Sequence, residues 1–240
     1  PTLGDNNVRF GVNAGNSIAD GGNYNVFVGD EAGTAITTGD NNVAIGFQAL
    51  DLEDAHGGNV AIGRSALSTL NAGADGFNTA VGHLAGDLMR TGVHNTLIGA
   101  LSGDALTTAA GNTAVGYQSL SGVVTGGYNT VMGWGAGLAN TSGVNNTGVG
   151  TQALFSNTVG NYNVAMGEGA LYTNIDGSRS TAIGRLALYT QEPASAVNMD
   201  NTAVGYQAGT SVIAGIQNTF VGSHAGDATD DGDYNTAVGH

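Results

Sequence analysis

Few residues in this sequence have the type and spacing that catalysis requires. A general base must reach the proton that it removes, and a nucleophile needs such a base beside it. Five histidines stand at unrelated positions, and none belongs to a recognisable motif with Ser or Asp: His56, His83, His94, His224 and His240. The chain has no Cys, which excludes a thiolate nucleophile and a thiolate metal site. We therefore expect no enzymatic activity, and we assign no catalytic residue and no cofactor.

One acidic stretch has a composition that could bind a hard cation. The sequence GDATDDGD at 226–233 holds four acids in eight residues, and carboxylate oxygens are the ligands that Ca²⁺ prefers. The stretch lacks the downstream Glu of an EF-hand loop, and the nonapeptide motif of calcium-binding rolls is absent. The favoured interpretation is a solvated turn, and we assign no metal ligand.

Aromatic residues recur at two fixed places relative to a repeated Asn and Gly. They precede the Asn at Tyr24, Phe77, Tyr128, Tyr162 and Tyr234, and they follow the Gly at Phe47, Tyr117, Trp134 and Tyr206. Exposed rings in a row could stack on the sugars of a host-surface glycan. Packing at subunit contacts or over the corners of the fold explains the same pattern and is favoured, so we assign no ligand-binding residue.

The composition restricts the function further. The chain has 42 Gly, only 2 Pro, 10% charged residues and a net charge of −14. Such a charge repels a phosphate backbone, so nucleic acid is not an expected partner. No apolar run of about 18 residues is present, and we expect neither membrane insertion nor a signal peptide within this chain. The scattered acids are typical of a solvated surface.

All of these residues must be positioned by a repeat that fills the chain. The pattern Asn-[Thr/Val]-x-apolar-Gly occurs 14 times, with Ser180 in place of the Asn in one copy, and ten of the 13 spacings are 17 residues. The other spacings of 18, 19 and 21 residues place insertions of one, two and four residues in a loop. We number each repeat from its Asn as position 1, and residues at the same position in successive repeats form a column.

Each column has its own character. Position 2 is Thr or Val, position 4 is always apolar, position 5 is Gly in all copies, position 8 is Ala or Ser, and position 9 is Gly or Leu. Position 12 is often large and apolar: Ile18, Ile36, Leu70, Met89, Leu106, Val123 and Val212. Gly stands three residues before the Asn in ten copies. The columns predict a strand over positions 1–4, a corner at the Gly of position 5, a second corner at the Gly before the Asn, and a buried side chain at position 4.

Two short strands and two corners in 17 residues predict one turn of an all-β, parallel β-solenoid or β-roll. About 14 turns spaced about 4.8 Å apart would form a stack on the order of 65 Å long, in which the Asn side chains bond amide to amide. We expect residues 1–240 to form a single repetitive segment of a longer fibre. The apolar inventory of each turn is thin, which favours self-association of several chains.

The quoted repeats resemble those of a known class of fibre. NTAVGYQAG at 201–209, NTFVGSHAG at 218–226 and NVAIGFQAL at 42–50 resemble repeats of bacteriophage tail fibre proteins. They are also similar to the head repeats of trimeric autotransporter adhesins, which have a shorter period and wind as three left-handed parallel β-rolls. The resemblance covers nearly the whole chain and implies an extracellular homotrimeric fibre. It does not separate a viral tail fibre from a bacterial surface adhesin.

The expected function is therefore structural. The first hypothesis is a shaft segment of a viral tail fibre that projects a host-attachment apparatus, and the second is the head or stalk of a bacterial trimeric adhesin. A carbohydrate-active β-helix enzyme is a third hypothesis from another class. It is disfavoured because such enzymes carry irregular loops and clustered carboxylates, whereas the loops here are short and the acids dispersed.

Overall fold

Both halves of the chain form a parallel β-solenoid. The computed structural model describes residues 6–122 and 125–240, and the chain divides into two compact units, residues 1–118 and 119–240. The first unit contains β1 (Val8–Phe10), β2 (Val26–Val28), β3 (Val43–Ile45), β4 (Val60–Ile62), β5 (Thr79–Val81), β6 (Thr96–Ile98) and β7 (Thr113–Val115). The second contains β8 (Thr130–Met132), β9 (Thr147–Val149), β10 (Val164–Met166), β11 (Thr181–Ile183), β12 (Thr202–Val204), β13 (Thr219–Val221) and β14 (Thr236–Val238). The predicted all-β solenoid with a 17-residue repeat is confirmed.

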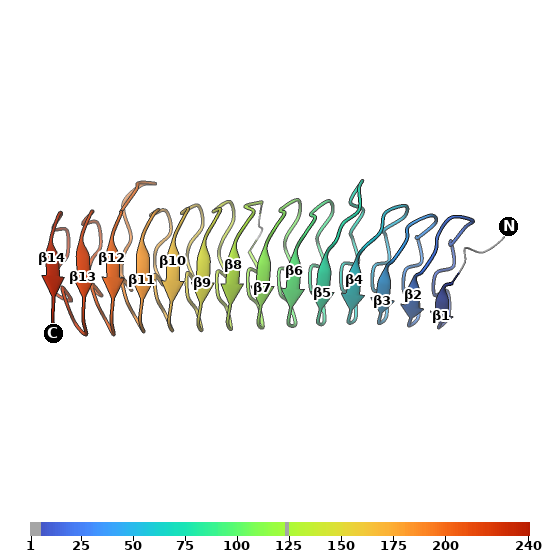
Figure 1. The fold of residues 1–240 in the computed structure, drawn as a ribbon, viewed down its shortest axis with the longest axis horizontal. Coiled ribbons are helices and arrows are strands. Elements are labelled where there is room, and N and C mark those ends of the chain that lie inside the picture. Colours follow the sequence, from blue (N-terminus) through green and yellow to red (C-terminus); the bar gives the residue numbers. More distant parts are fainter. Residues whose placement is uncertain (1–5, 123–124) are drawn as a thin grey trace. The chain divides into compact units, whose positions relative to one another are not determined.

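Consecutive strands within each unit pair in parallel and in the same register (Figure 1). The register survives all three insertions, because Val8 pairs with Val26, Val60 with Thr79, and Thr181 with Thr202. The additional residues are accommodated in the loops between the strands. The prediction that insertions fall in a loop is therefore confirmed.

The prediction of two strands in each turn is wrong for the described residues. Each turn of the solenoid has one strand of three residues at positions 2–4. The chain then leads back to the next strand through tight backbone turns, and we call this part of each repeat the return side. Backbone bonds still join successive turns there, as when the Gly137 N–H donates to the Ala153 carbonyl at 2.9 Å. The return side cannot be extended because positions 7 and 9 have positive φ, as in Gln152 (56°) and Leu154 (56°).

The glycine at position 5 is the first corner, as predicted. In Gly150 the angle φ is +134°, a region that side chains rarely adopt. A β-carbon there would lie 2.7 Å from the carbonyl oxygen of Gly167, the equivalent residue of the next turn. Backbone conformation and close stacking both require glycine at this corner.

The expected burial of the position 4 side chain is wrong. Strand residues alternate between faces, so the buried Asn at position 1 places position 3 inside and positions 2 and 4 outside. Ala203 is buried, for example, whereas Val204 lies on the outer surface. The core consists of positions 3, 8, 9 and 12 together with the Asn column. The large residues predicted at position 12 are buried as expected, except that Val123 lies outside the described residues.

The core is packed by size compensation between positions 3 and 9. Where position 3 is large, position 9 of the same turn is glycine, in the pairs Phe27–Gly33, Leu97–Gly103, Val131–Gly137 and Phe220–Gly226. Six turns with Ala or Gly at position 3 carry a buried leucine at position 9: Leu50, Leu67, Leu120, Leu154, Leu171 and Leu188. These leucines have φ between 48° and 56°, a strained region for a branched side chain. Filling the core therefore outweighs the backbone cost.

This compensation predicts coupling between Ala165 and Leu171. Leu171→Gly should lower the free energy of unfolding by about 2–4 kcal/mol because it opens a cavity. Ala165→Val alone should cost about 1–3 kcal/mol through overpacking. The double variant reproduces the Val131–Gly137 pair and should cost at least about 1 kcal/mol less than the sum of the two. Chemical denaturation measures all three variants, and strictly additive losses would contradict the size rule.

Candidate functional site

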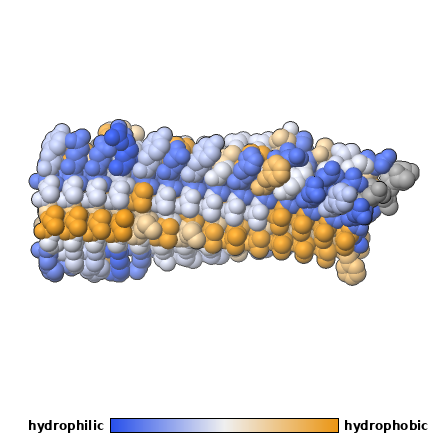
Figure 2. Space-filling view, viewed as in Figure 1, coloured by the Kyte–Doolittle hydropathy of each residue, from blue (hydrophilic) through white to orange (hydrophobic). Residues whose placement is uncertain are grey.

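The most extensive candidate surface is the outer face of the strands, which we call the β-face. It consists of the side chains at positions 2 and 4, and neither column contains a charged residue. Position 4 is Val, Ile, Met or Phe in every turn, and several of these side chains are about two-fifths exposed, among them Ile98 (40%), Met132 (43%), Met166 (42%) and Ile183 (38%). In Figure 2 hydrophobic residues line up as a stripe within each unit. An uncharged, regular apolar stripe is typical of an interaction surface.

Charged and aromatic residues border the β-face at position 6. In the second unit Arg185 donates from Nε to Glu168 at 3.0 Å, and its guanidinium lies over the Tyr206 ring at 5.8 Å. The bond to Glu168 is the main cause that raises the pKa of Arg185, so the arginine remains charged. The border thus carries charged and aromatic side chains, in contrast to the uncharged β-face beside it.

The Asn side chains form the predicted ladder, but their main hydrogen bonds join them to backbone groups instead of amide to amide. In eleven turns the side-chain oxygen accepts the backbone N–H of the next Asn, or of Ser180, at 2.8–3.2 Å. In nine turns the side-chain nitrogen donates to a carbonyl 14 residues ahead, at the second corner, at 2.8–3.0 Å. Amide-to-amide bonds occur as additional contacts, for example from Asn146 to Asn129 at 3.1 Å. The ladder is buried and satisfied, so its role is structural.

A second buried amide column in the second unit was not predicted. Asn140, Asn157, Asn174 and Gln191 occupy position 12, where most other turns have an apolar residue. Gln191 donates to Asn174 at 2.8 Å and accepts from Asn201 at 2.9 Å and from the Ser180 hydroxyl at 3.1 Å. Gln191 thus supplies the amide that is missing at Ser180. The regular 17-residue spacing of these polar residues is the sequence signal from which this column could have been predicted.

Glu53 is a fully buried carboxylate at position 12 of the first unit, also not predicted. Its Oε1 lies 3.2 Å from Nδ1 of His56 and accepts the Asp54 N–H, and its Oε2 accepts the Ala72 N–H at 3.2 Å. A buried carboxylate needs such partners to offset its desolvation. The contacts join Glu53 to its own loop and to the next turn, which is a structural use of both side chains.

The remaining histidines lie apart from any nucleophile and base arrangement. His83 lies 3.2 Å from Arg64, and His94 stacks on Phe77 with ring centroids 5.8 Å apart. His224 contacts Asp227 at 3.3 Å and lies between Tyr206 and His240. The contacts of His83 and His94 join neighbouring turns, as do the ring contacts of His224, whereas the His224–Asp227 pair lies within one turn.

Acids of the stretch at 226–233 accept hydrogen bonds from backbone N–H groups of the preceding turn. Asp233 accepts the Ile216 N–H at 2.8 Å, and Asp231 accepts the Ala214 N–H at 3.4 Å. Within residues 6–122 and 125–240, no group of three His, Asp or Glu side chains is placed to hold a metal ion. Glu192 plays the same part at the four-residue insertion, where it accepts the Ile175 N–H at 2.8 Å. Burial raises the pKa of Glu192, and this bond partly opposes that rise.

The predicted aromatic residues lie on the surface at the two corners. The rings that precede the Asn are 56–70% exposed, and those that follow the Gly are 40–49% exposed. An additional ladder of Phe155, Tyr172 and Tyr189 stacks at centroid distances of 4.9 and 5.0 Å at position 10. The faces of the stacked rings cover one another, so this ladder stabilises the return side of its unit.

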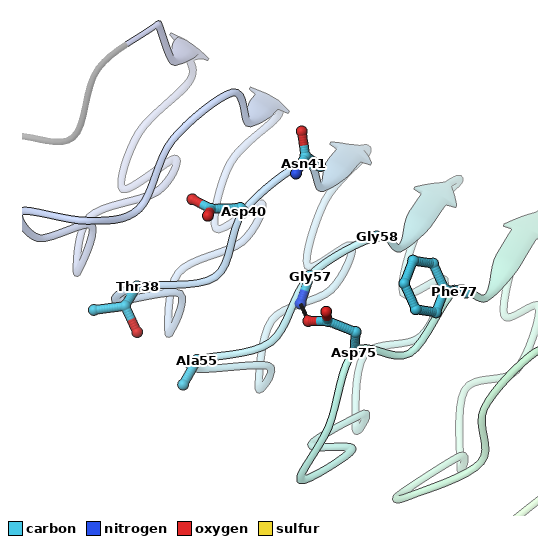
Figure 3. Close-up of a pocket in the computed structure, with 8 residues that line it drawn as sticks. All are labelled: Thr38, Asp40, Asn41, Ala55, Gly57, Gly58, Asp75 and Phe77. Carbon is cyan, nitrogen blue, oxygen red and sulfur yellow. Dashed lines mark hydrogen bonds between the residues drawn. The ribbon is translucent and has the colours of Figure 1, made fainter.

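A pocket of about 370 Å³ opens at the second corner of the first unit (Figure 3). Its floor is the backbone of Gly57 and Gly58, and Phe77 forms one wall. Thr38, Asp40, Asn41, Ala55 and Asp75 complete the lining. The pocket lies beside the two-residue insertion. In Figure 3 the Asp75 carboxylate reaches Gly57 and the Phe77 ring stands beside Gly58, whereas the side chains of Asp40 and Asn41 point away from these glycines.

The part of the chain that the structure describes contains no helix long and apolar enough to cross a membrane. Comparisons with protein-family models, with curated proteins and with solved structures find no match to the chain. The geometry of the described residues therefore carries the functional argument.

Proposed function

We propose that this chain is a structural shaft segment of a fibre, assembled from three copies that contact one another through the β-face. The observation that carries the proposal is the uncharged apolar column at position 4, which recurs on the outside of every turn. Burying such a column against an equivalent surface is favourable by about 25 cal/mol for each Å² of apolar area. Identical surfaces on identical chains lead to closed symmetric assemblies.

The fold supports a mechanical role. Successive turns in a unit are joined by strand bonds and return-side backbone bonds, and the Asn ladder adds a third link wherever position 1 is Asn. Such stacks gain stability from each neighbour contact and place loops at regular intervals. A viral tail fibre that projects a host-attachment apparatus is the first candidate. A bacterial surface adhesin is the second, and a membrane-anchor domain in the flanking sequence would favour it.

The proposal predicts the mass of three chains in solution and its loss on charging the β-face. Ile183→Lys places a cation on the β-face and should give mainly single chains. Ile175→Lys is the matched control, because Ile175 is 39% exposed and Ile183 38%, but Ile175 lies away from the β-face. Light scattering after gel filtration measures the mass, and circular dichroism checks that both variants fold.

Two outcomes contradict this proposal. Wild-type protein that remains a single chain over the accessible concentration range excludes self-association. Equal masses for the two lysine variants would show that the β-face is not the contact surface.

A further inference from the structure

We infer that the pocket beside Phe77 binds a neutral monosaccharide unit, so the segment carries a glycan site on its flank. The inference deepens the proposed function and rests on it in one respect, namely that the fibre is exposed to cell surfaces. The residues that carry it come from three consecutive turns of the first unit. None of them belongs to the β-face.

The hollow exists because this turn lacks a side chain at the residue before the Asn. The residue before the Asn has positive φ in each turn and is usually polar or aromatic, but it is Gly58 here. Gly57 precedes it, so two successive residues expose only backbone. The volume of about 370 Å³ lies at the lower end of the 300–1,000 Å³ that is usual for ligand pockets, a size suited to one sugar ring.

A fixed carboxylate supplies an acceptor that sugar hydroxyls need. Asp75 accepts the Gly57 N–H at 2.9 Å through Oδ1, which holds this carboxylate beside the pocket floor (Figure 3). Asp40 lines the hollow with its backbone, because its carboxylate points to the preceding turn, where Oδ1 accepts the Asn23 N–H at 2.6 Å. Charge-assisted bonds from hydroxyls are stronger than neutral ones. The Asp75 carboxylate repels an acidic sugar, which favours a neutral ligand.

An apolar wall completes the chemistry. The Phe77 ring packs against Gly58, where a β-carbon would lie 2.7 Å from Cδ1, and the ring is 56% exposed. The C–H surface of a pyranose can pack on such a ring while its hydroxyls turn toward Asp75 and the exposed backbone of Gly57 and Gly58. A polar floor beside an aromatic ring matches a sugar better than a bare cation.

Saturation-transfer NMR on the full chain tests the site with D-galactose, D-glucose and N-acetyl-D-glucosamine, each alone. We expect transfer to at least one sugar, with a dissociation constant near the millimolar range. Gly58→Tyr should abolish it, because its side chain fills the hollow and its β-carbon displaces the Phe77 ring. The backbone should tolerate this change, since Phe77 is exposed and Tyr24 and Tyr128 occupy the same column with φ of 58° and 61°. Gly111→Tyr is the matched control in that column and should retain binding.

Three results would overturn the inference: no transfer to any of the three sugars, transfer that Gly58→Tyr leaves unchanged, or transfer that EDTA removes. Loss of transfer on addition of EDTA would assign the Asp75 carboxylate to a cation. Asp75→Asn adds a second check, because the amide can still accept the Gly57 N–H but should weaken sugar binding. These measurements do not depend on oligomeric state, so their failure is distinguishable from failure of self-association.

Discussion

Gly150→Val is expected to destabilise the second unit by about 4 kcal/mol or more, beyond the usual range for a point substitution. The valine would have to adopt a φ of +134°, and its β-carbon would meet the carbonyl carbon and oxygen of Gly167, both 2.7 Å away. A β-branched residue is the least able to accept this backbone. Thermal unfolding followed by circular dichroism measures the effect.

Gly148→Ala, two residues earlier in the same turn, is the control. Position 3 is alanine in most turns, and a β-carbon at Gly148 would meet the end of Leu154 at 3.2 Å and a methyl group of Val131 at 3.4 Å. We expect a change within about 1 kcal/mol, since the Leu154 side chain can shift slightly. Equal effects of the two substitutions would refute the role given to the position 5 corner.

Excision of one whole turn is expected to leave the fold intact. Deleting residues 147–163 joins Asn146 to Val164, which restores the sequence of positions 1 and 2 and removes the Gly148–Leu154 pair together. Every remaining turn keeps a neighbour with matching columns. We expect cooperative unfolding with a melting temperature within about 5 °C of the wild type, since about 1 kcal/mol corresponds to 2–4 °C at this chain length.

Deleting residues 147–155 instead removes a fraction of a turn and should unfold the region around it. The remaining loop of that turn has no strand and no position 5 glycine, so neither the ladder nor the corner can stack. Loss of cooperative unfolding in this variant, beside its retention in the whole-turn deletion, would establish the 17-residue unit. Similar behaviour of the two deletions would contradict it.

The columns that depend on backbone geometry could be predicted from the sequence. The invariant glycine at position 5, the buried Ala at position 8 and the loop placement of the insertions each follow from one repeating constraint. The Asn ladder also followed, although its oxygen bonds the next backbone N–H more consistently than the next amide. A repeat amplifies such signals because the same contact recurs in each turn.

The direction of position 4 was mistaken because an apolar column was taken to be a core column. Once the Asn is buried, strand alternation requires Val204 to face outward and Ala203 inward. Position 3 varies among Gly, Ala, Val, Leu and Phe in β2 to β14, which conceals its role until the compensating residue at position 9 is considered. Glu53 could not be predicted, because its burial depends on His56 and on a backbone group of another turn.

The tolerance of the second corner to insertions has a practical consequence. The register from Thr181 to Thr202 is unchanged by four additional residues, so the loop at this corner can lengthen without shifting the paired strands. A foreign peptide grafted at 194–197, where the loop is exposed, should therefore be displayed without disturbing the scaffold. Grafts on successive turns of one unit would be spaced about 4.8 Å apart, which makes each unit a molecular ruler for arranging epitopes.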